Sequence, residues 1–259
     1  MTPRKLRDCS VALVTIFVVC GGLPQPSAFA QGCPELVGRW PYGPALAVAT
    51  SGDYAYFGNG TVLQVVDVSV PATPQVVGEI VLPGLVKGVV VSGGYAYVAD
   101  NEAGLRVIDV STPSAPVEVG FYDTPRYAEG VAVSGGYAYV ADFEAGLRVI
   151  DVSTPSAPVE VGFYNTPEDQ ALGVAVSGGY AYLADLSAGL RVIDVSTPSA
   201  PVEVGFYDTP GWAQGVAVSG GFAFVADGAA GLAIFRDCSL LFSDGFESGD
   251  TSAWSRTVP

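Results

Sequence analysis

The sequence predicts an all-β fold, a five-bladed β-propeller of four-stranded blades, and three observations lead to it. The 259 residues are 49% hydrophobic and include 33 Gly and 19 Pro, a composition too apolar for disorder and rich in turn formers. A segment beginning Gly-Leu-Arg-Val-Ile-Asp recurs identically at 104–122, 146–164 and 189–207. Tyr-Ala-Tyr, or Phe-Ala-Phe in the last copy, starts at 54, 95, 137, 180 and 222. Such spacing matches the period of about 40 to 45 residues of a four-stranded propeller blade.

Each repeat divides into four strand-like pieces, here called a to d in chain order. In the unit that begins at Gly130 the expected strands are 130–133, 137–141, 147–152 and 159–163. Gly135-Gly136 should turn a into b, Gly146 should turn b into c, and Pro155 with Pro158 should turn c into d. No piece has a helical period, so the unit is expected to be a single antiparallel sheet.

The chain ends predict how a ring of blades would close. Complete units begin near Ala45, Gly88, Gly130 and Gly173, whereas the unit from Gly215 stops near 236 without a strand d. The segment 34–40 matches strand d of the other units, with no a, b and c before it. We therefore expect it to complete the last blade, which would remove an open sheet edge. The propeller would span 31–238.

Residues 1–30 are predicted to be a signal peptide. A basic start with Arg4, Lys5 and Arg7 precedes the apolar stretch 11–19, and Ala28-Phe29-Ala30 provides a small-residue cleavage site. The mature protein should begin at Gln31 and be secreted, periplasmic or on the cell surface of a bacterium, with no transmembrane segment. A lipoprotein reading of Cys20 competes, but bulky Val19 precedes it. The tail 239–259 falls outside the repeat and is expected to be flexible.

The third strand of the unit resembles a known repeat. Leu105–Asp109, Leu147–Asp151 and Leu190–Asp194 read Leu-Arg-Val-Ile-Asp, and Leu63–Asp67 reads Leu-Gln-Val-Val-Asp. These copies resemble the LVIVD repeat, whereas the fifth copy, Leu232–Arg236, lacks the final Asp. The resemblance implies a propeller of exported bacterial or archaeal proteins, and it implies no defined activity.

Charge and composition exclude several functions. The formal net charge of −15 becomes −17 when Arg4, Lys5, Arg7 and Asp8 leave with the leader. A chain this acidic cannot neutralise phosphates, so nucleic acid and anionic membranes are not expected partners. The absence of His excludes Ser-His-Asp and Cys-His catalysis and any His-containing zinc site. We assign no catalytic residue, no metal and no cofactor.

Repeated aspartates allow two interpretations. Asp100, Asp142, Asp185 and Asp227 end strand b, and Asp67, Asp109, Asp151 and Asp194 end strand c. The first row could form a ring of metal ligands. The favoured interpretation is that both rows cap their local turns through Asx-type hydrogen bonds.

Two cysteines remain after leader cleavage, because Cys9 and Cys20 leave with it. In the repeat alignment Cys33 and Cys238 fall at the two ends of one tight c-to-d turn. We therefore predict a Cys33–Cys238 disulfide in an oxidising compartment.

Any specific site is expected on the d-to-a and b-to-c loops, where otherwise identical repeats differ. Strand alternation puts both loop types at the same end of the sheets. The candidate ligand-binding residues are Tyr127, Glu129, Glu168, Asp169, Trp212 and Gln214. Neutral drift of exposed loops is the alternative explanation of their variation.

Three functions remain open. The favoured one is a non-catalytic binding or scaffold module, a monomer that recognises an extracellular protein or glycan. The second is a carbohydrate-active enzyme using carboxylates such as Glu129, Glu168 and Asp169. The third is a purely structural surface protein. Fold alone does not choose among them.

Overall fold

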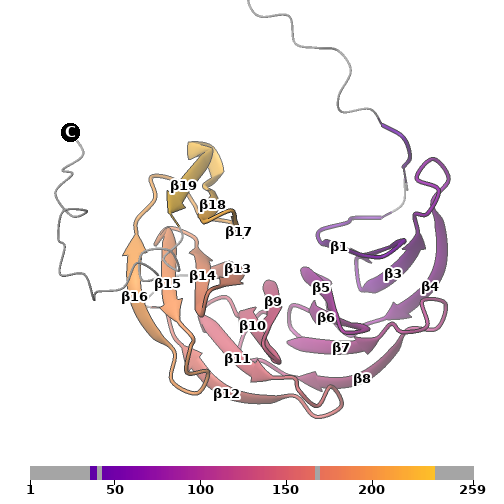
Figure 1. The fold of residues 1–259 in the computed structure, drawn as a ribbon, viewed down its shortest axis with the longest axis horizontal. Helices are drawn as coiled ribbons and strands as arrows, with labels where there is room; N and C mark the ends of the chain where they lie inside the picture. Colours follow the sequence, from indigo (N-terminus) through magenta and orange to yellow (C-terminus); the bar gives the residue numbers. More distant parts are fainter. Residues whose placement is uncertain (1–35, 40–42, 167–169, 237–259) are drawn as a thin grey trace, which may run out of the picture. The chain divides into compact units, whose positions relative to one another are not determined.

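The computed structural model describes residues 36–39, 43–166 and 170–236, and their regular structure is almost entirely β-strand. The five sheets belong to one compact unit that begins at Val37. Figure 1 shows them following one another in chain order.

Sheet 1 is β1 (Val48–Ser51), β2 (Tyr54–Asn59), β3 (Val62–Asp67) and β4 (Gln75–Val81); sheet 2 is β5 (Gly88–Ser92), β6 (Tyr95–Ala99), β7 (Leu105–Asp109) and β8 (Val117–Tyr122). Sheet 3 is β9 (Gly130–Ser134), β10 (Tyr137–Ala141), β11 (Leu147–Asp151) and β12 (Val159–Tyr164); sheet 4 is β13 (Ala171–Ser177), β14 (Tyr180–Asp185), β15 (Leu190–Asp194) and β16 (Val202–Tyr207). Sheet 5 is β17 (Gly215–Ser219), β18 (Phe222–Ala226) and β19 (Leu232–Arg236), with the 3-10 turn η1 (Gly228–Ala230) between the last two.

The four strands predicted for the unit from Gly130 are confirmed to within one residue at each end. All pairs are antiparallel, because each strand is followed directly by its neighbour in the sheet. Gly135 and Gly136 both have positive φ, 60° and 84°, as a two-residue hairpin of type I′ requires. The repeat therefore encodes one antiparallel sheet per unit.

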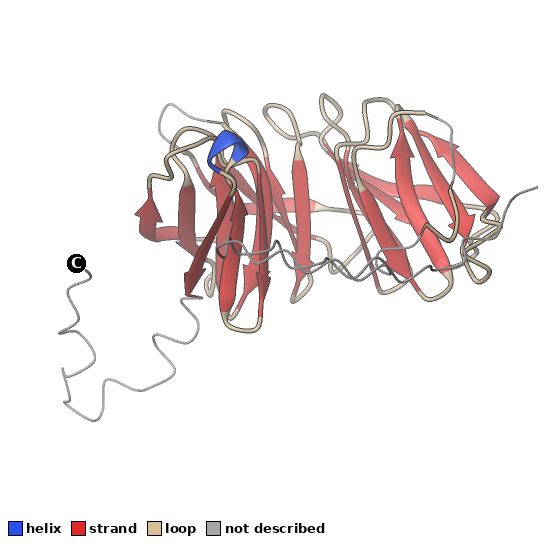
Figure 2. Ribbon diagram, turned by 90° about the horizontal axis from the view of Figure 1, so that it is seen from above, coloured by secondary structure: helices blue, strands red, loops and turns tan. Residues whose placement is uncertain are grey.

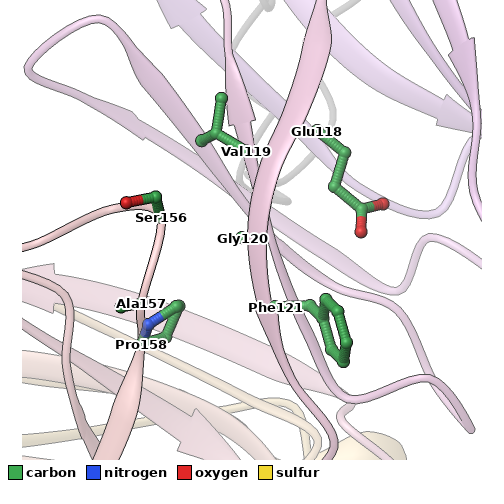
Figure 3. Close-up of a pocket in the computed structure, with 7 residues that line it drawn as sticks. All are labelled: Glu118, Val119, Gly120, Phe121, Ser156, Ala157 and Pro158. Atoms are coloured by element: carbon green, nitrogen blue, oxygen red, sulfur yellow. The ribbon is translucent and has the colours of Figure 1, made fainter.

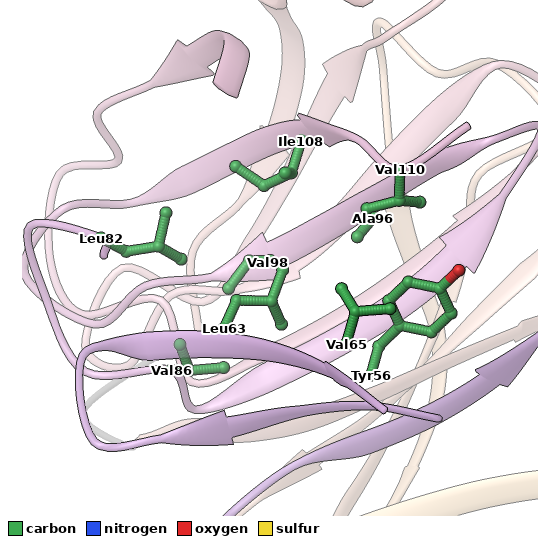
Figure 4. Close-up of a cluster of buried hydrophobic side chains, with 9 residues drawn as sticks. All are labelled: Tyr56, Leu63, Val65, Leu82, Val86, Ala96, Val98, Ile108 and Val110. Carbon is green, nitrogen blue, oxygen red and sulfur yellow. The ribbon is translucent and has the colours of Figure 1, made fainter. Parts of the chain in front are cut away.

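The hydrophobic core lies between consecutive sheets. Strand a of each sheet contacts strand a of the next, from β1 with β5 through to β13 with β17. Between sheets 1 and 2, side chains of both sheets and of the loop joining them pack in one cluster (Figure 4): Tyr56, Leu63, Val65, Leu82, Val86, Ala96, Val98, Ile108 and Val110. Because each sheet has a neighbour on either face, the b and c strands are nearly continuous apolar runs.

A glycine in strand d lets each sheet approach the c-to-d turn of the next one. A methyl group on Gly120 would overlap the carbonyl oxygen of Pro155, and Gly162 meets Pro198 in the same way. This approach is closer than any Cβ allows, so only glycine fits there. Gly205, the equivalent residue of β16, has no such neighbour among the residues that the structure describes.

Sheet 5 has three strands in the described part of the chain. The fourth was predicted at 34–40, of which only Leu36–Arg39 are described, and these four residues have no strand assignment. The outer strand β19 consequently exposes Leu232 and Ile234, at 63% and 57% of their surface. Five sheets fit a five-bladed propeller, with the closing strand not seen in place.

No helix in the residues that the structure describes is long and apolar enough to cross a membrane.

Candidate functional site

The loops that carry the candidate residues lie at one end of the strands. We call the segment between strand d of one sheet and strand a of the next an incoming loop; the four are 82–87, 123–129, 165–170 and 208–214. Figure 2 shows the strands running between two sets of loops, with η1, the b-to-c connection of sheet 5, at one of these ends. Two-residue bridges join the b-to-c loops to the incoming loops, Asn101 with Ala128 and Leu186 with Ala213, and Phe143 pairs with Ala171 at the start of β13. The predicted grouping of these two loop types is confirmed.

Buried aspartates at the ends of b strands hold the incoming loops. Asp142, which is fully buried, accepts a hydrogen bond of 2.7 Å from the Thr124 hydroxyl and one of 3.1 Å from the backbone N–H of Arg126. Asp227 makes the same pair of bonds to Thr209 and Gly211, at 2.5 and 3.0 Å. The prediction that this row caps local turns is wrong, since the bonded groups lie 16 and 18 residues earlier in the chain. The role of these aspartates could not be predicted from one repeat, because the donors belong to the preceding repeat.

Burial also perturbs the acidity of this row. The pKa of Asp100 is raised to about 6 by loss of solvation, which the Gly84 N–H and the Arg106 guanidinium only partly offset. The pKa of Asp142 is raised for the same first reason. Leu82 stands where Thr124 stands in the next incoming loop, so Asp100 lacks a hydroxyl donor and its Oδ1 has no hydrogen-bond partner.

An arginine from strand c accompanies each of three buried aspartates. The Nε atoms of Arg106, Arg148 and Arg191 lie 3.9, 3.7 and 3.4 Å from a carboxylate oxygen of Asp100, Asp142 and Asp185. Each guanidinium also lies over the ring of a strand d phenylalanine, at 4.6 to 5.1 Å. These cations are already paired inside the sheets, so they support the loops and do not face a ligand. In the described residues no group of three or more carboxylate or thiol side chains could hold a metal ion.

Three b-to-c loops contain a non-glycine residue in the left-handed region. Asn101, Phe143 and Leu186 have φ of 47°, 46° and 34°, whereas the equivalent residues of sheets 1 and 5 are Gly60 and Gly228. A bulky side chain in this region costs roughly 1 to 2 kcal/mol relative to ordinary backbone. The Asn-Gly and Asp-Gly pairs of sheets 1 and 5 were the signal that could have located this strained position from the sequence.

Two candidate aromatic residues are exposed at this end. Tyr127 is 42% exposed and packs edge-on against Phe143, with ring centroids 5.7 Å apart. Trp212 is 62% exposed and lies beside the backbone of Gly228. An exposed aromatic ring on a fixed loop can anchor a ligand through flat apolar contact.

The polar candidates differ in their partners. Glu129 accepts hydrogen bonds from Lys87 Nζ at 3.1 Å and from Asn101 Nδ2 at 3.2 Å, a cluster found at no other described junction. Such a carboxylate is well placed as a fixed acceptor. Gln214 is exposed. Glu168 and Asp169 lie outside the described residues, as do Cys33 and Cys238.

The opposite ends of the strands are uniform. Asp67, Asp109, Asp151 and Asp194 each accept a hydrogen bond of 2.8 to 2.9 Å from the N–H of the serine two residues later, which confirms the Asx turns predicted there. A groove of about 300 Å³ lies between β8 and the turn before β12 (Figure 3), lined by Glu118, Val119, Gly120, Phe121, Ser156, Ala157 and Pro158. Every lining residue belongs to the segment that recurs identically, so we attribute the groove to the contact between neighbouring sheets. No side chain in it differs from the equivalent side chain of another repeat.

Comparison with known proteins agrees with this architecture. The repeats define the class first: an all-β protein of five consecutive antiparallel sheets. The LVIVD repeat model matches residues 42–81, 83–124, 125–166, 170–209 and 210–235. The chain therefore belongs to the LVIVD repeat family, as the strand c motif predicted. No curated protein matches the chain.

Proposed function

We propose that the protein is an exported, non-catalytic binding propeller that holds an extracellular ligand on its incoming and b-to-c loops. The observation that carries the proposal is the placement of exposed, differing aromatic residues on loops whose backbones share the same hydrogen bonds. At the other end of sheets 2 to 4 the c-to-d turns are identical in sequence, and in each of them the aspartate caps its own turn. Rigid scaffolds that vary only in one set of loops are suited to recognition.

A closed ring is part of this proposal, and contacts of the N-terminal segment support it. A methyl group on Gly38 would overlap the carbonyl oxygen of Pro71 in the c-to-d turn of sheet 1. Gly78 meets Pro113 in the same manner, and so do the later glycines of strand d. Gly38 thus occupies the place of a strand d glycine in a blade that would precede sheet 1. Pairing of residues 34–40 with β19 would cover the exposed Leu232 and Ile234 and remove the open edge.

In a closed ring the last blade would take strand c from the C-terminal part and strand d from the N-terminal part, so its c-to-d turn would be interrupted. The Cys33–Cys238 disulfide would join the two ends of this interrupted turn. A bridge across so long a loop would stabilise the ring by about 4 to 5 kcal/mol in the chain-entropy model. Alkylation and mass measurement of the non-reduced protein isolated from its export compartment test the disulfide and the cleavage of the signal peptide. We expect no free thiol and an N-terminus at Gln31; two free thiols would exclude the bridge.

The binding role is tested with the mature protein immobilised against a glycan array and purified surface proteins of the same cells. Tyr127→Ala and Trp212→Ala should each weaken a specific ligand by about 1 kcal/mol or more. Val159→Ala is the control, since the exposure of Val159 lies between those of Tyr127 and Trp212 but the residue follows a c-to-d turn. Affinity lost in the control and kept in both loop variants would place the site at the opposite end.

A further inference from the structure

Two of the incoming loops carry the same pattern two sheets apart. One reads Tyr127-Ala128-Glu129 and the other Trp212-Ala213-Gln214, and each runs directly into Gly-Val-Ala-Val-Ser of strand a. The pattern is an exposed aromatic residue, a buried alanine and a planar polar side chain. The loop into sheet 2 has Leu85-Val86-Lys87 at these positions, so the pattern is not imposed by the repeat.

Matching hydrogen bonds give the two loops the same backbone. The N–H groups of Glu129 and Gln214 donate to the carbonyls of Ala141 and Ala226, both at 2.9 Å. Ala128 and Ala213 are fully buried, and both donate across to the preceding b-to-c loop at 2.9 Å. The carboxylates of Asp142 and Asp227 hold the loop starts. Tyr127 and Trp212 therefore stand at equivalent places on equivalent supports.

The two aromatic residues differ in what lies beside them. Tyr127 packs on Phe143, which is kept in the left-handed region at φ 46°. At Trp212 the same place is taken by Gly228, which lies beside the Trp212 backbone, and Trp212 is 62% exposed. An exposed aromatic ring on a hydrogen-bonded loop, next to an amide or carboxylate, matches a sugar ring, which offers an apolar C–H face and hydroxyl groups at its edge.

The charges around these two loops favour an uncharged ligand over an anionic one. The cations of these two loops and their surroundings are already paired: Lys87 with Glu129 at 3.1 Å and Arg126 with Glu144 at 3.5 Å. The chain as a whole is strongly acidic. An anionic glycan would meet repulsion without a free cation in either loop to offset it.

We infer that Tyr127 with Glu129, and Trp212 with Gln214, form two equivalent subsites for sugar units of a neutral polysaccharide. The inference rests on the proposed binding function and names its ligand class. Two subsites on one rigid scaffold would give a polymer a higher affinity than a short oligosaccharide, because the second contact becomes intramolecular.

Calorimetric titration of the mature protein tests the inference directly. The probes are cello-, laminari-, xylo- and mannohexaose, their parent soluble polysaccharides, and polygalacturonate as the charged comparator. We expect one neutral series to bind with two oligosaccharides per protein, falling to one in Trp212→Ala or Tyr127→Ala and to none in the double variant. The remaining subsite should keep its affinity, whereas polymer affinity should fall about tenfold or more in each single variant.

Leu85→Ala is the matched control, since Leu85 occupies the equivalent exposed place in the loop into sheet 2. It should keep two sites, and circular dichroism with thermal melting should show all variants folded. A stoichiometry of one in the unmodified protein, or sugar binding that survives the double variant, would overturn the two-subsite inference while leaving a binding function. Loss of a protein ligand in these variants, with no sugar bound, would overturn the glycan assignment alone. No loop-dependent ligand of either class would overturn the proposed function itself.

Discussion

The two ends of sheets 2, 3 and 4 use aspartate in opposite ways. At the end of strand c, Asp109 is partly exposed, bonds to the N–H of Ser111 two residues on, and has a lowered pKa because those hydrogen bonds favour its charged form. At the end of strand b, Asp100 is fully buried, bonds to Gly84 of the incoming loop, and has a raised pKa because burial disfavours charge. Burial and the origin of the donor, rather than residue type, decide which role the aspartate takes.

Replacing Asp142 with alanine should have the largest effect on this contrast. The change removes the acceptor for Thr124 and Arg126 and leaves the buried Arg148 with one partner fewer. We expect a loss of about 3 to 5 kcal/mol in the free energy of unfolding, measured by urea denaturation. Asp151→Ala, at the exposed end of the same sheet, should lose distinctly less. Equal losses would mean that the two rows do not differ in strength.

The pH dependence of stability should separate the two rows. Asp100 has a pKa of about 6 when folded and 3.8 otherwise, so the folded protein binds the proton more tightly between these values. Stability should therefore rise by about 2 to 3 kcal/mol as pH falls from 7 towards 4, and change little from this group above its folded pKa. Asp67, Asp109 and Asp151 act in reverse, since their lowered pKa gives stability that is lost only as pH falls below 3.8.

Asp100→Asn should abolish the rise in stability that Asp100 causes between pH 7 and pH 4. It should keep the loss of stability that the other aspartates cause below pH 3.8. Denaturation series at several pH values measure the stability of Asp100→Asn and of the unmodified protein. A slope between pH 4 and 6 that is the same in Asp100→Asn and in the unmodified protein would assign the effect to another group, such as Asp142.

The sheets also meet at their c-to-d ends, and there the contact is steric. Gly120→Ala would place a methyl group against the rigid carbonyl of Pro155, so we expect a loss of about 2 kcal/mol in thermal or urea unfolding. Gly205→Ala is the control, because no atom of the described residues lies within 4 Å of the added atom. Unchanged stability of Gly120→Ala would show that the turn yields easily.

Thr124→Val should have the smallest effect. It removes the hydroxyl that bonds Asp142 but keeps the shape of the side chain, which recreates the situation of Asp100 beside Leu82. We expect a loss of about 1 kcal/mol and a further rise in the pKa of Asp142, measured by carboxyl titration in NMR. Thr112→Val, in an exposed c-to-d turn, should change neither quantity. An unmoved Asp142 pKa would mean that the hydroxyl does not stabilise the charged carboxylate.

Much of the fold could be predicted from the sequence because its signals are local. The Gly135-Gly136 hairpin, the four strands of each unit and the Asp151–Ser153 turn depend on residues within one repeat. The candidate residues Tyr127 and Trp212 could be chosen for the same reason, since they depart from otherwise identical repeats. The role of Asp142 was not, since its partners lie in the preceding unit.

By itself, the sequence determined the number of repeats, the strands within each and the loops in which they differ, because turn chemistry and alternation act over a few residues. Tertiary structure alone decided which aspartates are buried, that Phe143 is held in the left-handed region beneath Tyr127, and that Gly120 touches the next sheet. These features depend on how one sheet packs against another. The spacing between those sheets arises from the sum of many side-chain contacts, which no short segment specifies.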